Sequence, residues 1–317
     1  MQIVDFNESH IPMAAKLALK NYNEEKEIVG VLPPVKNWPD LKKYAENGLG
    51  VAAFEEDTML GFLCAGNPFK NAFGSTDAVG VFSPLHGNGA VIEKRGAVYG
   101  RMYQKAAEKW AASGAASHAI CVYAHDKTSK EQLFNYGFGS RCIDAIRPMG
   151  EIEGIGESNY TLVELKKEDY EKVYPLYKML ENHMAESPCF IKRPFSFETF
   201  MISANKPASR FFAAMTGNEM AAFLKTTYGG ETFITYNDDI IHIDGAFCLP
   251  EHRGKGIYSH LLNYTIQILK KEGNKYLSVD FESINPSAHN FWTKYFSVYT
   301  CGLARRIDEH CINRIYK

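Results

Sequence analysis

The sequence predicts an α/β protein of two tandem domains, each built on a mixed sheet of the α+β type. Its 317 residues are many for one domain and sufficient for two. Residues 240–273 have the pattern of a buried strand, a glycine-rich turn and an amphipathic helix. Similar segments recur in order at a spacing of about 160 residues, which indicates an internal duplication.

The two halves begin alike, with a short strand, a polar turn and a helix. Each half continues with a β-hairpin whose apolar residues match without a gap. The matching pairs are residues 1–22 with 160–181, Ala52-Ala53 with Ala213-Ala214, and Phe62-Leu63 with Phe223-Leu224. An acidic, glycine-rich stretch at residues 148–158 reads as the linker between them. We therefore expect a first domain at residues 1–150 and a second at 151–317.

Composition excludes several classes of protein. A net charge of −2 argues against nucleic acid as the main partner. No apolar run is long enough to cross a membrane, and the first ten residues lack the features of a signal peptide. Seven cysteines without a C-x-x-C pair indicate free thiols in a reducing compartment and no metal site. A cytoplasmic protein is expected.

The turn of the 240–273 segment contains the sequence Arg253-Gly254-Lys255-Gly256-Ile257. Glycines let the backbone curl so that successive N–H groups point into one concavity at the start of the helix. Two cations flank these amides, which suits a phosphate or pyrophosphate group. A nucleotide P-loop and a dinucleotide fingerprint are both disfavoured, because neither spacing occurs here. A tight turn with exposed charges is the simpler alternative.

This stretch resembles the GNAT superfamily of N-acyltransferases, whose signature is a strand followed by [QR]-x-x-G-x-[GA]. The matching unit runs from Arg253 to Tyr258, and Tyr258 stands where the family usually has a small residue. The resemblance continues through a strand at residues 276–280, Asn285, and a helix opening at residues 287–292. The first half resembles a degenerate copy. Aligning its helix sets Lys94-Arg95-Gly96-Ala97-Val98 against the cradle, so that Arg95 and Ala97 replace the two glycines. A Cβ there blocks a close approach of phosphate to the backbone. The Gly87-Asn88-Gly89 turn is an open alternative for that half.

The resemblance implies acetyl-CoA as the acyl-donor substrate and no metal. Its pyrophosphate would rest on the cradle amides, and its pantetheine arm would pair with the end of the preceding strand. A backbone N–H at Phe247 or Cys248 would hold the oxyanion. The residues implied in binding acetyl-CoA are Phe247, Cys248, Leu249, Arg253, Gly254, Lys255, Gly256, Ile257, Tyr258 and Asn285.

The attacking amine must be neutral, so we expect a base beside the strand. Because side chains alternate along a strand, His242, Asp244, Ala246 and Cys248 are predicted to share one face. His242 and Asp244 are the candidate bases, with Glu282 as a third. A core imidazole and a backbone-bonded carboxylate are the competing interpretations.

The family often places a tyrosine in the last helix to protonate the thiolate, and Trp292 stands there. An indole N–H is too weak an acid for that role. Tyr295, His289 or Tyr258 could donate the proton instead, and Tyr295 is the candidate that we carry forward.

The sequence thus predicts a GNAT-type acyltransferase, transferring groups other than amino-acyl groups. Direct attack is expected, because no base at recognisable spacing supports an acyl intermediate on Cys248. The acceptor would be a small-molecule or protein amine, and a homodimer is possible. The alternatives are a non-catalytic acyl-CoA-binding or regulatory module and a tandem-domain enzyme that uses aminoacyl-tRNA; the net charge and the cradle disfavour the latter.

Overall fold

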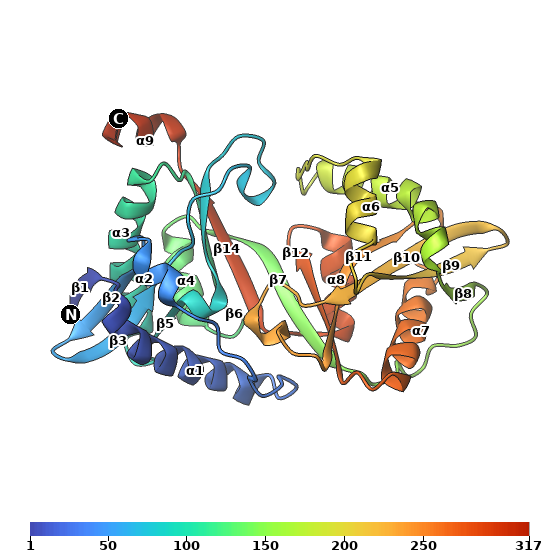
Figure 1. The fold of residues 1–317 in the computed structure, drawn as a ribbon, viewed down its shortest axis with the longest axis horizontal. Coiled ribbons are helices and arrows are strands. Elements are labelled where there is room, and N and C mark those ends of the chain that lie inside the picture. Colours follow the sequence, from blue (N-terminus) through green and yellow to red (C-terminus); the bar gives the residue numbers. More distant parts are fainter. Residues whose placement is uncertain (317) are drawn as a thin grey trace. The chain divides into compact units, whose positions relative to one another are not determined.

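The structure is a computed structural model that describes residues 1–316 and divides into two compact units (Figure 1). Unit 1 comprises Met1–Asp144, Phe281–His289 and residues 298–316. Unit 2 comprises Ala145–Asp280 and Asn290–Ser297. The end of the chain thus belongs to the same unit as its beginning. The predicted α/β fold with mixed sheets is confirmed.

A four-stranded antiparallel sheet forms the first part of unit 1, in the order β1-β2-β3-β5. Helices α1 and α3 pack on its opposite faces. The alternation of β2 explains this arrangement, because Ala52 belongs to the core under α1 whereas Val51 and Ala53 belong to the core under α3. The elements are β1 (Gln2–Asp5), α1 (Ile11–Ile28), α2 (Lys42–Glu46), β2 (Val51–Glu55), β3 (Thr58–Leu63), β5 (Asn88–Ala90) and α3 (Arg95–Ala112).

A second group of strands in unit 1 has the order β4-β6-β14-β7. Strand β14 comes from the end of the chain and pairs antiparallel with β6 and with the first part of β7. The elements are β4 (Gly80–Ser83), β6 (Ser117–Tyr123), α4 (Lys127–Asn135), β7 (Gly139–Pro148), β14 (Thr300–Arg306) and α9 (Glu309–Tyr316).

Unit 2 carries strands in the order β12-β11-β10-β9-β8, of which only β11 and β12 are parallel. Helices α5 and α6 cover one face of these strands and α7 covers the other (Figure 1). The elements are β8 (Thr161–Glu164), α5 (Tyr174–Ala185), α6 (Phe197–Ala204), β9 (Arg210–Thr216), β10 (Glu219–Tyr228), β11 (Ile240–Cys248) and α7 (Ile257–Lys271). Three further elements have residues in both units, namely β12 (Tyr276–Glu282), α8 (Pro286–Tyr295) and β13 (Ser297–Val298).

Helix α7 forms where its apolar spacing predicts it. Gly256 caps its start in the left-handed conformation, and Gly273, with φ of +92°, follows its end. Five aliphatic side chains lie buried along one face, and each contributes about 1.5–3 kcal/mol by leaving water. They are Ile257, Leu261, Leu262, Ile266 and Leu269.

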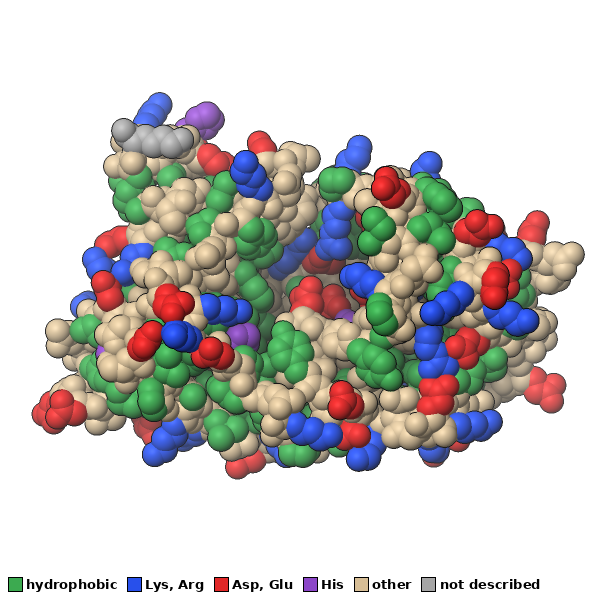
Figure 2. Space-filling model, viewed as in Figure 1, with side chains coloured by type: hydrophobic (Ala, Val, Ile, Leu, Met, Phe, Trp, Pro, Cys, Tyr) green, Lys and Arg blue, Asp and Glu red, His purple; other side chains and the backbone are tan. Residues whose placement is uncertain are grey.

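Among residues 1–316, none of the helices combines the length and hydropathy that a membrane span requires. The face of the molecule in Figure 2 carries basic and acidic side chains interspersed with one another.

Candidate active site

Strands β11 and β12 separate partway along their length. Their parallel pairing runs from Ile240 opposite Tyr276 to Ile243 opposite Val279. Strand β11 then continues to Cys248 while pairing with β10 on its other side. In the described part of the chain, no other strand neighbours that edge of β11. The separation therefore leaves an open strand edge that an extended ligand can join by main-chain hydrogen bonds.

A β-bulge lies at the point where the strands separate. Thr226 pairs with Ile243 and Leu224 pairs with Ala246, so two residues of β11 oppose Lys225 alone. Because Leu224 and Thr226 share a face of β10, Ala246 lies on the face of Ile243. The prediction that Ala246 and Cys248 share the face of His242 is therefore wrong, since the extra residue shifts the alternation.

Asp244, a predicted base, is the counterion of a buried lysine. The Lys225 side chain is 1% exposed, and its Nζ donates to Asp244 Oδ2 at 2.6 Å and to Ser203 Oγ at 2.7 Å. A buried ammonium is costly unless it is paired in this way. The Asp244 carboxylate therefore serves to neutralise the positive charge of Lys225.

His242, the other predicted base, lies within unit 2 with both ring nitrogens bonded. Its Nδ1 is 2.9 Å from Ser278 Oγ, and its Nε2 is 2.7 Å from Asp280 Oδ1. The His242 side chain is 4% exposed, whereas that of Asp280 is 29% exposed. Asp280 is the first residue of β12 beyond the paired segment. The sequence analysis did not single out Asp280. The only pattern that could have indicated it is its position two residues after Ser278, because alternate residues of a strand share a face.

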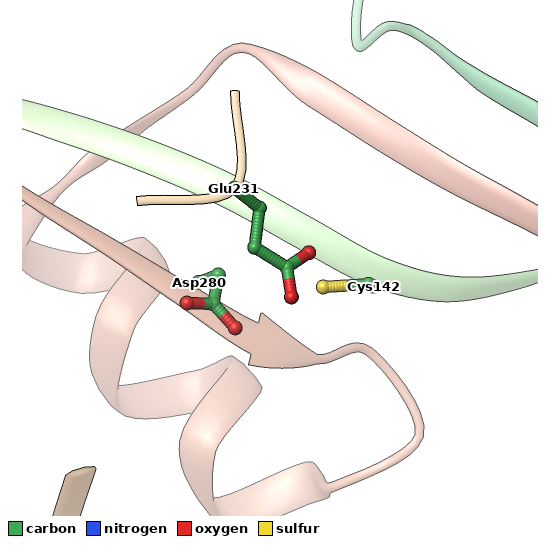
Figure 3. Close-up of side chains that lie close together, drawn as sticks. All are labelled: Cys142, Glu231 and Asp280. Atoms are coloured by element: carbon green, nitrogen blue, oxygen red, sulfur yellow. The ribbon is translucent and has the colours of Figure 1, made fainter. Parts of the chain in front are cut away.

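Two further side chains surround Asp280. A carboxylate oxygen of Glu231, in the loop after β10, lies within 4.8 Å of one of Asp280 (Figure 3). On α5, burial raises the pKa of Tyr177, and the negative charges of Asp244 and Glu181 raise it further. The Tyr177 hydroxyl therefore stays protonated and is available as a hydrogen-bond donor.

The predicted cradle is an exposed, glycine-lined turn between β11 and α7. Gly254 and Gly256 have φ of +73° and +76°, a conformation that side chains disfavour. A Cβ built on Gly254 would meet no atom within 4 Å, so the turn is open to solvent. The first backbone hydrogen bond into α7 runs from His260 N to Gly256 O at 3.2 Å. The amides of residues 257–259 precede it and are the orphan donors of the helix start.

The cradle also carries positive charge. Arg253 Nε donates to Cys248 O at 3.1 Å, and its guanidinium lies over the Phe247 ring at 5.4 Å. Within residues 1–316, neither Arg253 nor Lys255 forms an ion pair, and both are exposed. These two cations remain available to an anionic ligand.

The turn before α3 in unit 1 differs from the cradle in its charges. Arg95 lies in the first turn of α3 and is buried, with one guanidinium nitrogen 2.5 Å from Glu24 and another 3.6 Å from Asp126. Lys94 Nζ contacts Glu55 at 2.9 Å. Positive charge at this helix start is therefore offset by carboxylates of the same unit.

Cys248, Tyr258 and Tyr295, which were also predicted as site residues, differ in their surroundings. Burial raises the pKa of the Cys248 thiol to about 11, which disfavours the nucleophilic thiolate. Tyr258 donates its hydroxyl to Phe223 O at 2.7 Å, and burial raises its pKa. The Tyr295 ring packs on Phe291 at the end of α8.

The three other residues of the predicted set are placed as follows. Leu249 donates its N–H to Ala221 O on β10 at 2.9 Å. Asn285 accepts a hydrogen bond from Ser287 Oγ at 2.8 Å, just before α8. Ile257 is buried as the first residue of α7.

One part of the chain matches a known protein family. Residues 161–297 match the model of the acetyltransferase (GNAT) family. This part of the chain is a GNAT domain. The GNAT domain thus contains the strand separation, the cradle and α7. No curated protein matches the chain.

A solved structure shares the fold over 96% of the chain. A GCN5-related N-acetyltransferase from Sphaerobacter thermophilus is similar with a TM-score of 0.60 at 10% identity, covering 96% of this chain and 95% of that one. A probable N-acyltransferase from Enterococcus faecalis V583 has a TM-score of 0.39 at 9% identity, with 98% and 73% covered. At 10% identity, the similarity to the Sphaerobacter thermophilus protein concerns the fold alone. This similarity extends beyond the GNAT domain.

Proposed function

We propose that the protein is an N-acetyltransferase that moves the acetyl group of acetyl-CoA directly to an amine. The observation that carries the proposal is the separation of β11 and β12 beside an open glycine cradle within a GNAT domain. An anion-binding turn next to an unpaired strand edge suits a ligand with a pyrophosphate and an extended amide arm.

The residues of the cradle fit coenzyme A. Backbone amides from Gly254 to Tyr258 would hold the pyrophosphate, with Arg253 and Lys255 adding charge. The pantetheine arm would join the open edge of β11. Bound there, acetyl-CoA supplies an activated thioester.

The alternation of N–H groups along β11 indicates which backbone amide can donate a hydrogen bond to the oxyanion. Leu249 donates its N–H to β10, so the N–H of Cys248 points to the opposite edge of β11. That edge is the open one. Of the two predicted donors, Phe247 and Cys248, the Cys248 amide is therefore the one suited to stabilise negative charge on the carbonyl oxygen.

Asp280 is the base that the geometry favours. The amine nitrogen bonds to the carbonyl carbon, the C–S bond breaks with its electron pair on sulfur, and the ammonium proton passes to the Asp280 carboxylate. His242 would fix that carboxylate through its Nε2 at 2.7 Å. Asp244 is less suited because it neutralises Lys225. The thiolate would take its proton from Tyr295, as predicted from the sequence, or from solvent.

Unit 1 is proposed to be a degenerate copy that does not bind acetyl-CoA. Its Arg95 and Lys94 are already paired with carboxylates, and Gly96 lacks the left-handed conformation of the cradle glycines. It would contribute structure rather than chemistry.

The test is acetyl transfer itself. The protein is incubated with acetyl-CoA and a panel of amines while thiol release is followed, and acceptor-dependent release is expected. Absence of release with every amine would contradict the proposal. The tryptophan at position 292 favours a second candidate, an acyl-CoA-binding module, for which calorimetry would show tight binding of acetyl-CoA without turnover.

A further inference from the structure

A cavity lies in unit 2 between α5, α6 and the strands β9 and β10. Its volume is about 190 Å³. Four aromatic rings contribute to its wall, those of Tyr177, Phe195, Phe200 and Phe211, and the charged side chains of Glu181, Arg193 and Lys225 also line it.

The cavity adjoins the proposed reaction site through two of its walls. A Cβ built on Gly245, a residue of the β-bulge, would lie 3.3 Å from the Tyr177 hydroxyl oxygen. Lys225 contacts Asp244, the other residue of the bulge, at 2.6 Å. Both walls therefore touch the point where β11 and β12 separate and the open edge of β11 begins.

The lining combines a cluster of stacked aromatic rings with polar and charged side chains. The rings of Tyr177 and Phe195 stack with centroids 5.5 Å apart and planes inclined by 13°, and Phe200 packs against both. The positive charge of Lys225 is offset by Asp244. The ring cluster favours a flat aromatic group, which can stack or pack edge-on.

We propose that this cavity binds the acceptor and that the acceptor is a small primary amine bearing a single aromatic ring. This inference rests on the proposed acetyltransferase function. The ring enters the cavity against Tyr177 and Phe195, and the amine lies toward Asp280. A cavity of about 190 Å³ is smaller than the pockets that enclose drug-sized ligands, so an amino sugar of several rings does not fit within it.

The first experiment compares kcat/KM for 2-phenylethylamine, 1,4-diaminobutane and glucosamine with acetyl-CoA in excess. We expect 2-phenylethylamine to be preferred at least tenfold. The Phe195→Ala variant should lose about tenfold in kcat/KM for 2-phenylethylamine, chiefly through KM, with unchanged affinity for acetyl-CoA. The Phe134→Ala variant, which removes an exposed ring on α4, should behave as the wild type.

Calorimetry separates failure of this inference from failure of the proposed function. Binding of 2-phenylethylamine is measured with and without coenzyme A, for the wild type and for Phe195→Ala. Transfer to diaminobutane or glucosamine in preference, with no effect of Phe195→Ala, would overturn the inference and leave the acetyltransferase intact. If no amine is acetylated, Phe195-dependent binding of 2-phenylethylamine would still support the pocket, and no binding would overturn it.

Discussion

Arg95 and Arg253 make the same backbone hydrogen bond in the two units. Each donates Nε at 3.1 Å to the carbonyl oxygen five residues earlier, that of Ala90 and of Cys248 respectively. Arg95 is the first residue of α3, whereas Arg253 lies four residues before α7. Arg95 is buried among carboxylates, whereas Arg253 is exposed beside the cradle.

This relationship predicts opposite effects of the same substitution. Arg95→Met leaves Glu24 and Asp126 without their buried counterion, and should lower the free energy of unfolding by about 3–5 kcal/mol. Arg253→Met should change it by about 0.5 kcal/mol or less, because the side chain is exposed, while weakening acetyl-CoA binding. Urea denaturation and calorimetry measure the two quantities. Equal destabilisation by both changes would contradict the assignment.

The cradle glycines predict a binding defect confined to one unit. Gly256→Glu forces a side chain into a left-handed conformation, which costs about 1–3 kcal/mol, and adds negative charge at the phosphate site. Acetyl-CoA affinity should fall at least tenfold by calorimetry. Ala97→Glu, on the exposed side of the start of α3, is the matched control and should bind normally. An equal loss from both would show that unit 1 also binds the ligand.

The surroundings of Asp280 and Asp244 predict different roles for these two carboxylates, which lie where β11 and β12 separate. Asp280→Asn should lower kcat by about 10²–10⁴-fold with little change in the KM for acetyl-CoA, as expected for loss of a general base. Asp244→Asn should mainly lower stability, because buried Lys225 loses its charged partner. A larger loss of kcat from Asp244→Asn would reverse the assignment.

His118 makes the stability of unit 1 depend on pH. Burial lowers its pKa to about 4, while Tyr103 and the Ala115 carbonyl oxygen occupy its ring nitrogens. In the unfolded chain the imidazole takes up a proton near its ordinary pKa of 6.5. The folded state therefore loses up to about 3 kcal/mol of stability as the pH falls from 6.5 to 4.

The His118→Gln variant removes this titration. Its free energy of unfolding in urea should fall less between pH 7 and pH 4.5 than that of the wild type. His86, whose pKa burial also lowers to about 4, titrates in both proteins and does not affect the comparison. The same loss in variant and wild type would exclude His118 as a source of the pH dependence.

Periodicity and glycine placement predict much of the fold. The helix at 257–271 and the hairpins of both halves follow from apolar spacing, and the cradle follows from Gly254 and Gly256. The bulge opposite Lys225 could not be predicted, because one extra residue in a strand leaves no change in composition. Asp280 was missed for a related reason, since where parallel strands part depends on tertiary pairing that no local pattern records.

The position of β14 has a consequence for biosynthesis. In the described part of the chain, β14 (residues 300–306) lies between β6 and β7, and it follows unit 2 in the sequence. Until the ribosome has passed that segment, both strands keep exposed edges that invite pairing with other nascent chains. The strands of unit 1 can therefore complete their pairing only after unit 2 has been translated, although Met1–Asp144 precede unit 2 in the sequence.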